Sequence, residues 1–315
     1  MKHLFIINPA AGGMKGKLEV VEREIRTFAE SLPDPYEIYE TKAPMDACSK
    51  IIGEAESADM LYVYACGGDG TLNECVNGAA IRPNVAVTQY PCGTGNDFLR
   101  MFGVENVPKF RNLQSLADGV IRPLDLIDCD GRYGLNICSV GIDARVGADV
   151  HKYSGIPLIG GASGYIVSLM VNVIKGVTQR FRITTEDETV DQKITLACAC
   201  SGRFYGGGFN PIPEAIPDDG ILECLIVEPV SRLKVAQIVG RYKKGQYRSF
   251  PELIRYSQSS LMEIECDREF VVNIDGEAIF ADKITFRLIP KGVNFLFPRE
   301  LDYYEALGVK KEPQQ

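Results

Sequence analysis

The sequence has 315 residues, of which 45% are hydrophobic and 24% are charged. This length is typical of two domains, and the composition is that of a globular rather than a disordered chain. The net charge is -8, from 34 Lys and Arg against 42 Asp and Glu, which excludes a nucleic acid as partner because phosphate contacts need a basic surface. An anionic membrane is disfavoured too, unless the positive charge is concentrated in one place.

Cysteine and histidine usage excludes several kinds of site. None of the ten Cys residues belongs to a C-x-x-C motif, and the closest pair is Cys198 and Cys200. The chain starts without the pattern of a secretory signal peptide, so we expect a cytoplasmic protein with reduced thiols. With two His residues, His3 and His151, we expect neither a His-based zinc site nor an ordinary Ser-His-Asp triad.

The first part of the chain alternates between the strand and helix periods of hydrophobic residues. The pattern predicts strands at 4–7, 36–41, 60–65 and 85–89, and helices at 18–32, 46–55, 72–80 and 94–101. Such alternation is typical of a mostly parallel sheet covered by helices on both faces. We therefore expect an α/β domain over residues 1–128.

The second part of the chain is rich in strand patterns. Strands are predicted at 180–190, 194–200, 222–227, 261–266, 270–274, 278–281 and 283–288, and helices at about 163–175 and 231–243. This favours an all-β, sandwich-like domain over residues 129–291, while the segment at about 292–315 is expected to pack back on the first domain. The uncharged stretch 153–174 is no membrane span, because Gly and Pro break its first half and its second half fits a buried helix.

Three glycine-rich turns follow predicted strands in the first domain. They are NPAAGG at 8–13, GGDGT at 67–71 and PCGTGND at 91–97. Glycine lets backbone N–H groups approach phosphate oxygens, and the helix that follows adds a favourable dipole. Three such turns at the carboxyl edge of one parallel sheet favour a nucleotide or phosphate site, although the P-loop and dinucleotide-binding motifs are both absent.

Two carboxylates lie in these turns, Asp69 and Asp97. They would repel a bound phosphate unless a cation lies between them. Mg²⁺ is the natural choice, because it binds one or two carboxylates together with substrate phosphates.

The run GGDGTLNE at 67–74, followed by P-x-G-T-x-N-D-F at 91–98, resembles the diacylglycerol kinase catalytic domain. The resemblance is closest to soluble bacterial lipid kinases, which include sphingosine-kinase-like members. NAD kinases and phosphofructokinases share the first element, and the second separates lipid kinases from both. The resemblance extends from Ile7 to about Phe297, and it implies an NAD-kinase- or phosphofructokinase-like first domain that uses ATP and Mg²⁺.

The turns and the resemblance together indicate a set of nucleotide-binding residues. They are Asn8, Pro9, Ala10, Gly12, Thr41, Gly67, Gly68, Asp69, Gly70, Thr71, Asn73, Gly93, Thr94, Asn96 and Asp97. Asp69 is also expected to be catalytic, acting on Mg²⁺ directly or through water.

An acidic turn, PEAIPDDGIL at 213–222, leads into a predicted strand. On its own it is either ordinary turn chemistry or an Asp that holds a hard cation with neighbouring carbonyl groups. The resemblance favours the cation, a structural Mg²⁺ bound by Asp219 and by the carbonyl groups of Ile216 and Ile221. The adjacent Asp218 leaves the choice of carboxylate open.

The run DGE at 275–277 is flanked by alternating apolar residues, which predicts a hairpin with a type I′ turn. Its two carboxylates are candidates for the general base that a hydroxyl acceptor requires. The resemblance points to this element as the base that takes the proton of the lipid hydroxyl. We name both Glu277 and Asp275, with Glu277 preferred.

These features predict an ATP- and Mg²⁺-dependent lipid kinase that converts diacylglycerol to phosphatidic acid, with catalysis in the cleft between the domains. The alternatives are a kinase for a soluble substrate such as NAD and a non-catalytic nucleotide-binding regulator. The segment from Arg232 to Arg255 holds seven basic residues and one acidic residue, so it is either a solvated surface or a peripheral contact with the inner face of the membrane. A homodimer formed through sheet edges also suits a chain of this type.

Overall fold

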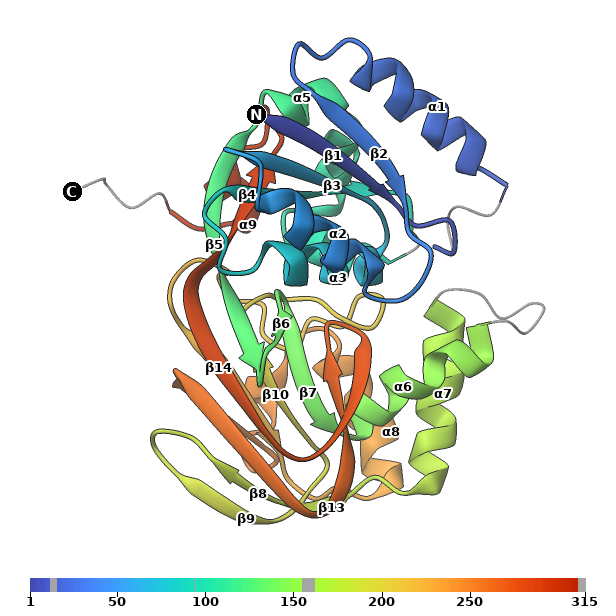
Figure 1. The fold of residues 1–315 in the computed structure, drawn as a ribbon. Coiled ribbons are helices and arrows are strands. Elements are labelled where there is room, and N and C mark those ends of the chain that lie inside the picture. The colour runs from blue at the N-terminus through green and yellow to red at the C-terminus, as the bar shows by residue number, and fades with distance from the viewer. Residues whose placement is uncertain (12–15, 94, 155–161, 311–315) are drawn as a thin grey trace. The chain divides into compact units, whose positions relative to one another are not determined.

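The computed structural model describes residues 1–11, 16–93, 95–154 and 162–310. Two compact units make up the chain: unit 1 comprises Met1–Leu124 and a segment that begins at Lys291, and unit 2 comprises Asp125–Pro290. Two long strands, β5 (Val120–Cys129) and β14 (Glu277–Phe297), run from one unit into the other (Figure 1).

Unit 1 contains a parallel sheet. Its strands are β1 (Lys2–Ile7), β2 (Tyr36–Glu40), β3 (Leu61–Gly67), β4 (Val85–Pro91) and the end of β14. Their order is β2–β1–β3–β4–β14, with Phe5 of β1 opposite Ile38 of β2 and Tyr64 of β3. Strands β1, β3 and β4 are buried almost throughout, which explains their continuous apolar sequences. The expected α/β architecture is confirmed.

The helices of unit 1 differ in length from the sequence prediction near the glycine turns. They are α1 (Leu18–Ala29), α2 (Asp46–Ala55), α3 (Asp69–Ala79), α4 (Asp97–Arg100), η1 (Val104–Arg111), α5 (Leu113–Ala117) and α9 (Tyr303–Leu307). Helix α3 begins at Asp69 rather than at residue 72, inside the glycine turn itself. Helix α4 is far shorter than the predicted 94–101, because Asn96 before it has a left-handed backbone with φ of 54°.

Aromatic packing ties the end of the chain to unit 1. The rings of Phe295 and Phe297 lie 5.0 Å from Phe98 and 5.1 Å from Phe102, respectively, between centroids. The ring of Tyr303 in α9 lies 5.6 Å from Phe102. Such ring pairs contribute about 0.5–1.5 kcal/mol each beyond their burial. The segment from Phe295 to Tyr303 therefore packs against the unit in which the chain begins.

Unit 2 is built on antiparallel strands. Besides parts of β5 and β14 it holds β6 (Arg132–Gly134), β7 (Ile137–Gly141), β8 (Gln179–Thr184), β9 (Thr189–Ile194), β10 (Leu196–Cys200), β11 (Leu222–Val227), β12 (Ile254–Ser259) and β13 (Leu261–Ile274). The order is β12–β11–β10–β7–β13–β14, with the β8–β9 hairpin attached to β13. The predicted β-rich second part is confirmed.

Both faces of this antiparallel sheet are apolar, and alternate residues of one strand serve two separate cores. In β11, Cys224 and Ile226 belong to a core shared with β8, β9, β13 and β14. Leu225 and Val227 face the other way, into a core shared with α8 (Arg232–Tyr242). The remaining helices are α6 (Ile142–Ser154), α7 (Ala162–Lys175) and η2 (Tyr247–Ser249).

Several sequence predictions in this unit were wrong in detail. The strand predicted at 180–190 is a hairpin, because the polar residues 185–188 form a turn in which Thr185 N–H donates to the Glu188 carbonyl (2.9 Å). The strands predicted at 261–266 and 270–274 are one strand with a register shift, and those at 278–281 and 283–288 are one strand as well. Strands β7 and β12 and helix α6 were not predicted. Among the described residues, no helix combines the length and the apolar character that a membrane crossing needs.

Candidate active site

In unit 1 a side-chain hydrogen bond joins the turn after β1 to α3, the helix that follows β3. Asn8, directly after β1, donates through Nδ2 to Oγ1 of Thr71 in α3 (3.1 Å). The Oδ1 atom of Asn8 accepts the N–H of Ala10 (2.9 Å), which shapes the first glycine turn. Thr71 and Asn73 are buried, while Pro9 and Ala10 are exposed. Gly12 and Thr94 lie outside the described residues.

The second and third turns are in direct backbone contact. The N–H groups of Cys92 and Gly93 both donate to the Gly67 carbonyl (3.0 and 3.1 Å). A Cβ atom on Gly93 would lie 2.4 Å from the Gly68 Cα, and one on Gly67 would lie 2.2 Å from Oγ1 of Thr71. No larger residue fits at either position without displacing its neighbour. These two glycines are therefore required by the packing of the turns.

The two predicted carboxylates of unit 1 have different partners. Asp69 Oδ1 accepts the N–H of Asp97 (2.7 Å), so the start of α3 is bound to the start of α4. Asp97 is a buried residue, only 7% exposed, and its Oδ1 atom lies 3.1 Å from Nε of Arg100. The chain thus supplies a cation to Asp97, which the sequence reasoning missed although the i, i+3 spacing of Asp97 and Arg100 signals such a pair.

Asn96 holds the third turn in shape. Its Nδ2 donates to the Gly93 carbonyl (3.2 Å), and its Oδ1 accepts from Nε2 of the buried Gln89 (3.1 Å). Gln89 was not predicted as a site residue, although a lone amide in an otherwise apolar strand is a usable signal. Asn96 therefore has a shaping role that its backbone conformation and both of its side-chain atoms support.

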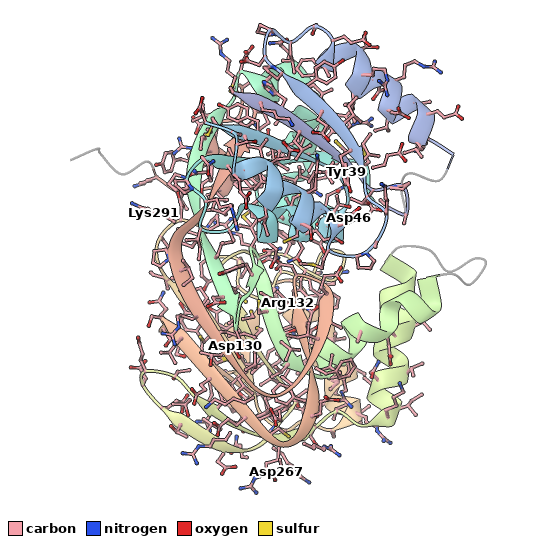
Figure 2. All side chains as sticks on the ribbon, viewed as in Figure 1. Tyr39, Asp46, Asp130, Arg132, Asp267 and Lys291 are labelled. Atoms are coloured by element: carbon pink, nitrogen blue, oxygen red, sulfur yellow. The ribbon has the colours of Figure 1, made fainter. Side chains whose placement is uncertain are left out.

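Thr41 lies beside the same edge of the sheet, at the end of β2. Its N–H donates to the Ile7 carbonyl (2.9 Å), one residue before Asn8. The turn is held by Asp46, which accepts from Lys42 N–H (2.8 Å) and from the Tyr39 hydroxyl (3.1 Å); Tyr39 and Asp46 are labelled in Figure 2. The predicted residues of four strands thus gather at one edge of the parallel sheet.

In unit 2 the hairpin at 274–277 is confirmed. Ile274 pairs with Glu277, and both intervening residues, Asp275 and Gly276, have positive φ (51° and 99°), as a type I′ turn requires. The Asp275 carboxylate accepts the N–H groups of Asn136 (3.0 Å) and Ile137 (2.8 Å), and also that of Leu135. Glu277 is exposed at the start of β14. One carboxylate of the turn is committed to the backbone, and the other faces solvent.

A buried polar chain supports this turn from behind. Asn273 Oδ1 accepts the N–H of Gly276 (3.0 Å), and its Nδ2 is 3.5 Å from Oγ of Ser139. The Ser139 hydroxyl donates to the buried Asp143 of α6 (2.7 Å). The sequence reasoning missed all three residues, although a polar residue in a strand that is otherwise buried is a signal for such a chain.

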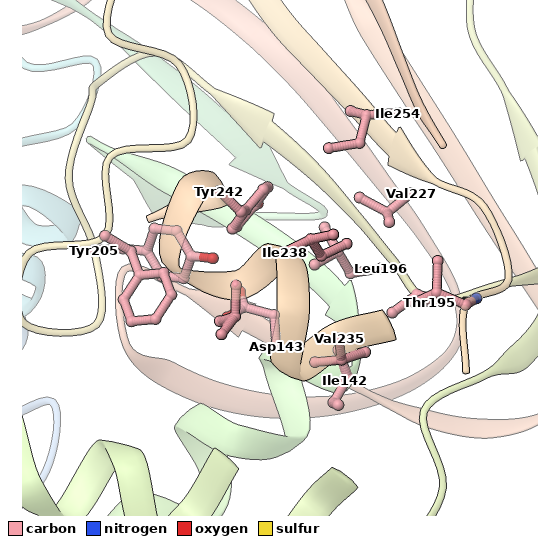
Figure 3. A pocket seen from close by; sticks show the side chains of 13 residues that line it. Ile142, Asp143, Thr195, Leu196, Tyr205, Val227, Val235, Ile238, Tyr242 and Ile254 are labelled. Carbon is pink, nitrogen blue, oxygen red and sulfur yellow. Dashed lines mark hydrogen bonds between the residues drawn. The ribbon is translucent and has the colours of Figure 1, made fainter. Parts of the chain in front are cut away.

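An apolar cavity of about 60 Å³ lies between α8 and the sheet of unit 2 (Figure 3). Its lining includes Leu196, Val227, Val235, Ile238 and Tyr242, with the Asp143 carboxylic group among the few polar neighbours. The volume exceeds the roughly 10–15 Å³ that one water needs, but an apolar cavity of this kind stays dry. It suits a short apolar group.

The acidic turn of unit 2 gathers negative charge around Asp219. Although Asp219 is exposed at the residue level, partial burial of its carboxyl group, with Glu223, Asp125 and Asp218 nearby, raises its pKa to about 6. Gly220 N–H donates to Asp125 (2.7 Å), and Ile221 N–H donates to Asp219 (3.0 Å). Within the described ranges no cluster of three or more His, Cys, Asp or Glu side chains is arranged to hold a metal. A cation here would depend on Asp219 and main-chain oxygens.

The contact between the second and third turns gives a stability prediction. Gly93→Ala should lower the free energy of unfolding of unit 1 by about 2 kcal/mol or more, because the new methyl group overlaps the Gly68 backbone. Gly53→Ala in α2 is the matched control, since nothing lies within 4 Å of its Cβ position. It should stabilise by about 0.5–1 kcal/mol as a helical Gly→Ala change. Urea unfolding curves of both variants test this, and equal curves would contradict the packing argument.

Family models match both parts of the chain. The diacylglycerol kinase catalytic domain matches residues 2–129, and the YegS C-terminal NAD kinase beta sandwich-like domain matches residues 136–297. A Shewanella frigidimarina protein named "Probable lipid kinase YegS-like" is 26% identical over 79% of this chain and 80% of its own length. A Staphylococcus haemolyticus protein that is also named as a lipid kinase is 25% identical over 81% of this chain and 82% of its own length.

Solved structures share the fold. A structure of a diacylglycerol kinase from Bacillus anthracis superimposes with a TM-score of 0.66 at 22% identity, covering 95% of this chain and 98% of that one. Another structure from the same organism gives a TM-score of 0.73 at 24% identity, covering 94% and 96%. At these identities the likeness establishes the fold. With both family models matched in order along the sequence, the chain belongs to the YegS-like lipid kinases, phosphotransferases that join a diacylglycerol kinase catalytic domain to a β-sandwich-like C-terminal domain.

Proposed function

We propose that this protein transfers the terminal phosphoryl group of ATP to the hydroxyl group of diacylglycerol, forming phosphatidic acid. The observation that carries the proposal is the bonded set of turns in unit 1, where Asn8 meets Thr71 and Gly68 meets Gly93. Backbone N–H groups of such turns suit phosphate oxygens, and phosphoryl transfer depends mainly on positioning and charge stabilisation.

Asp69 is the residue that we assign to the metal. Its carboxylate offers hard oxygen ligands at the start of α3, and the bond from Asp97 N–H to Oδ1 fixes its orientation. Mg²⁺ held there would neutralise negative charge on the phosphate oxygens. Asp97, already paired with Arg100, is assigned to positioning the third turn.

Glu277 is the candidate general base. In the reaction the acceptor O–H gives its proton to the base, its oxygen bonds to the terminal phosphorus, and the bond from that phosphorus to the bridging oxygen breaks to release ADP. Asp275 is poorly suited to take the proton, because its carboxylate accepts three backbone N–H groups that favour the charged form. Exposed Glu277 can meet an acceptor hydroxyl.

The cavity under α8 is the proposed place for an apolar part of the lipid. Its lining is almost wholly aliphatic and aromatic, and its volume of about 60 Å³ suits the end of a chain rather than a whole acyl group. A soluble acceptor such as NAD would leave a cavity of this character unused. This observation favours the lipid over the soluble alternative.

We further propose a structural cation at Asp219, with the carbonyl groups of Ile216 and Ile221 as the other protein ligands. The donors would all be oxygens, which is the set that Mg²⁺ prefers. Burial, together with repulsion from neighbouring carboxylates, raises the pKa of Asp219 to about 6, and a cation bound here would relieve both effects.

The acceptor and the role of Asp69 can be tested together. Radiolabelled phosphate from ATP should pass to diacylglycerol in mixed micelles, with sphingosine, polyprenol and NAD offered separately. Asp69→Asn should lower turnover at least about a hundredfold, because it removes the charge that holds the metal. Unfolding of this variant should match the wild type, since Asn retains an oxygen for the Asp97 N–H.

Three outcomes would contradict these assignments. Transfer to NAD alone would replace the lipid kinase with a kinase for a soluble substrate. ATP binding without transfer to any acceptor would favour a nucleotide-binding regulator. Near-normal turnover of Asp69→Asn would remove Asp69 from the metal site while leaving the acceptor result intact.

The two carboxylates of the hairpin turn should respond differently to amidation. Glu277→Gln should lower turnover by about 10²–10⁴-fold with unchanged stability, as expected for an exposed general base. Asp275→Asn should lower the free energy of unfolding of unit 2 by about 1.5–3 kcal/mol, because it loses charge-assisted bonds to the backbone. Glu269→Gln, an exposed Glu of β13, is the control. An inactive but stable Asp275→Asn beside an active Glu277→Gln would make Asp275 the base.

Cation binding at Asp219 should depend on pH. A folded carboxyl group with its pKa raised to about 6 destabilises unit 2 as pH rises from about 4 to about 6, and a cation that replaces the proton offsets this loss above about 6. Mg²⁺ at about a hundred times its dissociation constant should stabilise by about 2.7 kcal/mol near neutral pH and have little effect near pH 5. Calorimetry of the wild type, Asp219→Asn and Asp218→Asn tests this. Loss of the effect in Asp218→Asn alone would move the site to Asp218.

A further inference from the structure

The outward face of α8 is both cationic and apolar. Its exposed residues are Arg232, Leu233, Ala236, Gln237, Gly240 and Arg241, and the exposed Lys244 lies in the turn that directly follows α8. The sequence from 231 to 251 contains no Asp or Glu. The opposite face of the same helix, with Val235 and Ile238, lines the apolar cavity. The helix therefore separates that cavity from whatever meets its outer face.

Ion pairing divides the basic segment that the sequence singled out. Arg248 pairs with Glu214 (2.6 Å), and Arg255 pairs with both Glu188 (2.9 Å) and Glu228 (2.6 Å). These arginines are largely neutralised within the protein. Within the described part of the chain, neither Arg241 nor Lys244 forms an ion pair, so the uncompensated charge lies on α8 and not over the whole segment.

Two large aliphatic side chains are exposed beside these cations. Leu233 is 70% exposed and Ile174, at the end of α7, is 69% exposed. Arg232, the neighbour of Leu233 in the sequence, is linked to Ile174, because its Nη2 donates to the Ile174 carbonyl (2.6 Å). Large aliphatic side chains exposed among cations suit a partner that offers both apolar groups and negative charge.

We propose that this surface, the α8 face (Ile174, Arg232, Leu233, Arg241 and Lys244), binds an anionic lipid bilayer. Arg232, Arg241 and Lys244 contact headgroup phosphates, and Leu233 with Ile174 enters the boundary between headgroups and acyl chains. This inference rests on the proposed function, because binding through the α8 face would place the cavity behind α8 next to the acyl chains of the bilayer. Its evidence is the local charge and the exposed aliphatic pair.

Vesicle sedimentation of the whole protein tests the proposal without any turnover. The wild type should bind vesicles of phosphatidylcholine that contain phosphatidylglycerol, and bind vesicles of phosphatidylcholine alone much more weakly. Loss of one cation near an anionic surface weakens binding about fivefold. The double variant Arg241→Glu with Lys244→Glu should therefore bind about twenty-fivefold more weakly or worse. Ile174→Ser with Leu233→Ser should weaken binding about tenfold or more.

A matched control separates the α8 face from the total charge. Lys193→Glu with Arg287→Glu changes the net charge equally at exposed positions on β9 and β14, and it should leave vesicle binding nearly unchanged. Equal weakening in both charge-reversal variants would overturn the proposal. So would equal binding of the wild type to the two kinds of vesicle, or no binding to either. Conversion of a dimer to a monomer by Ile174→Ser with Leu233→Ser, with vesicle binding intact, would make this face an interface between two copies.

Failure of the proposed function would look different. The α8-face variants should phosphorylate a dispersed short-chain diacylglycerol as the wild type does, because their changes lie outside the turns and the cavity. If the wild type phosphorylates no lipid, the proposed function is wrong, and the vesicle result still decides the α8 face. If these variants fold, keep this turnover and lose vesicle binding, both proposals are supported.

Discussion

The contact between the backbones of Gly68 and Gly93 constrains the rest of unit 1. With 2.4 Å between the Gly68 Cα and the position of a Cβ on Gly93, the turns after β3 and β4 can meet only if residue 93 has no side chain. That contact places Gly67, whose carbonyl accepts two N–H groups from the third turn, and it brings Asp69 within reach of Asp97. A phosphate site built from backbone amides needs the two turns to lie this close. If side chains kept the turns apart, the amides of one turn could not reach a phosphate group bound by the other.

Hydrogen bonding, rather than residue type, separates the roles of acidic residues in this protein. Asp275 and Glu277 are two residues apart in one turn, yet the first accepts three backbone N–H groups and the second is exposed. Asp97 and Asp69 divide similarly, since Arg100 neutralises the first while the second is oriented by a backbone amide. A carboxylate whose lone pairs are already occupied stabilises structure, and one that is oriented but accessible suits chemistry.

Much of the fold could be predicted from sequence because it follows from local pattern. The apolar runs of β1, β3 and β4 and the turn at Asp275 and Gly276 depend on residues close in the chain. The predictions that were wrong concern features that depend on contacts between distant residues or on the backbone conformation of a single residue. Helix α4 is short because Asn96 is left-handed, and β13 continues through a register shift that alternation alone reads as a break. In the polar chain from Asn273 to Asp143, the contact between Asn273 and Ser139 joins segments far apart in sequence, so spacing alone does not pair them.

A net charge of -8 and an anionic membrane partner are compatible because charge acts locally in salt solution. At physiological ionic strength the screening length is about 8 Å, so a bilayer that touches α8 senses Arg232, Arg241 and Lys244 far more than carboxylates elsewhere. The ion pairs of Arg248 and Arg255 matter for the same reason, since they remove from the surface two charges that composition alone would count. Repulsion from the rest of the chain would then favour one orientation on the bilayer, with the α8 face inward. The excess of acidic residues, which disfavours general anion binding, would thus help to determine which face of the protein contacts the bilayer.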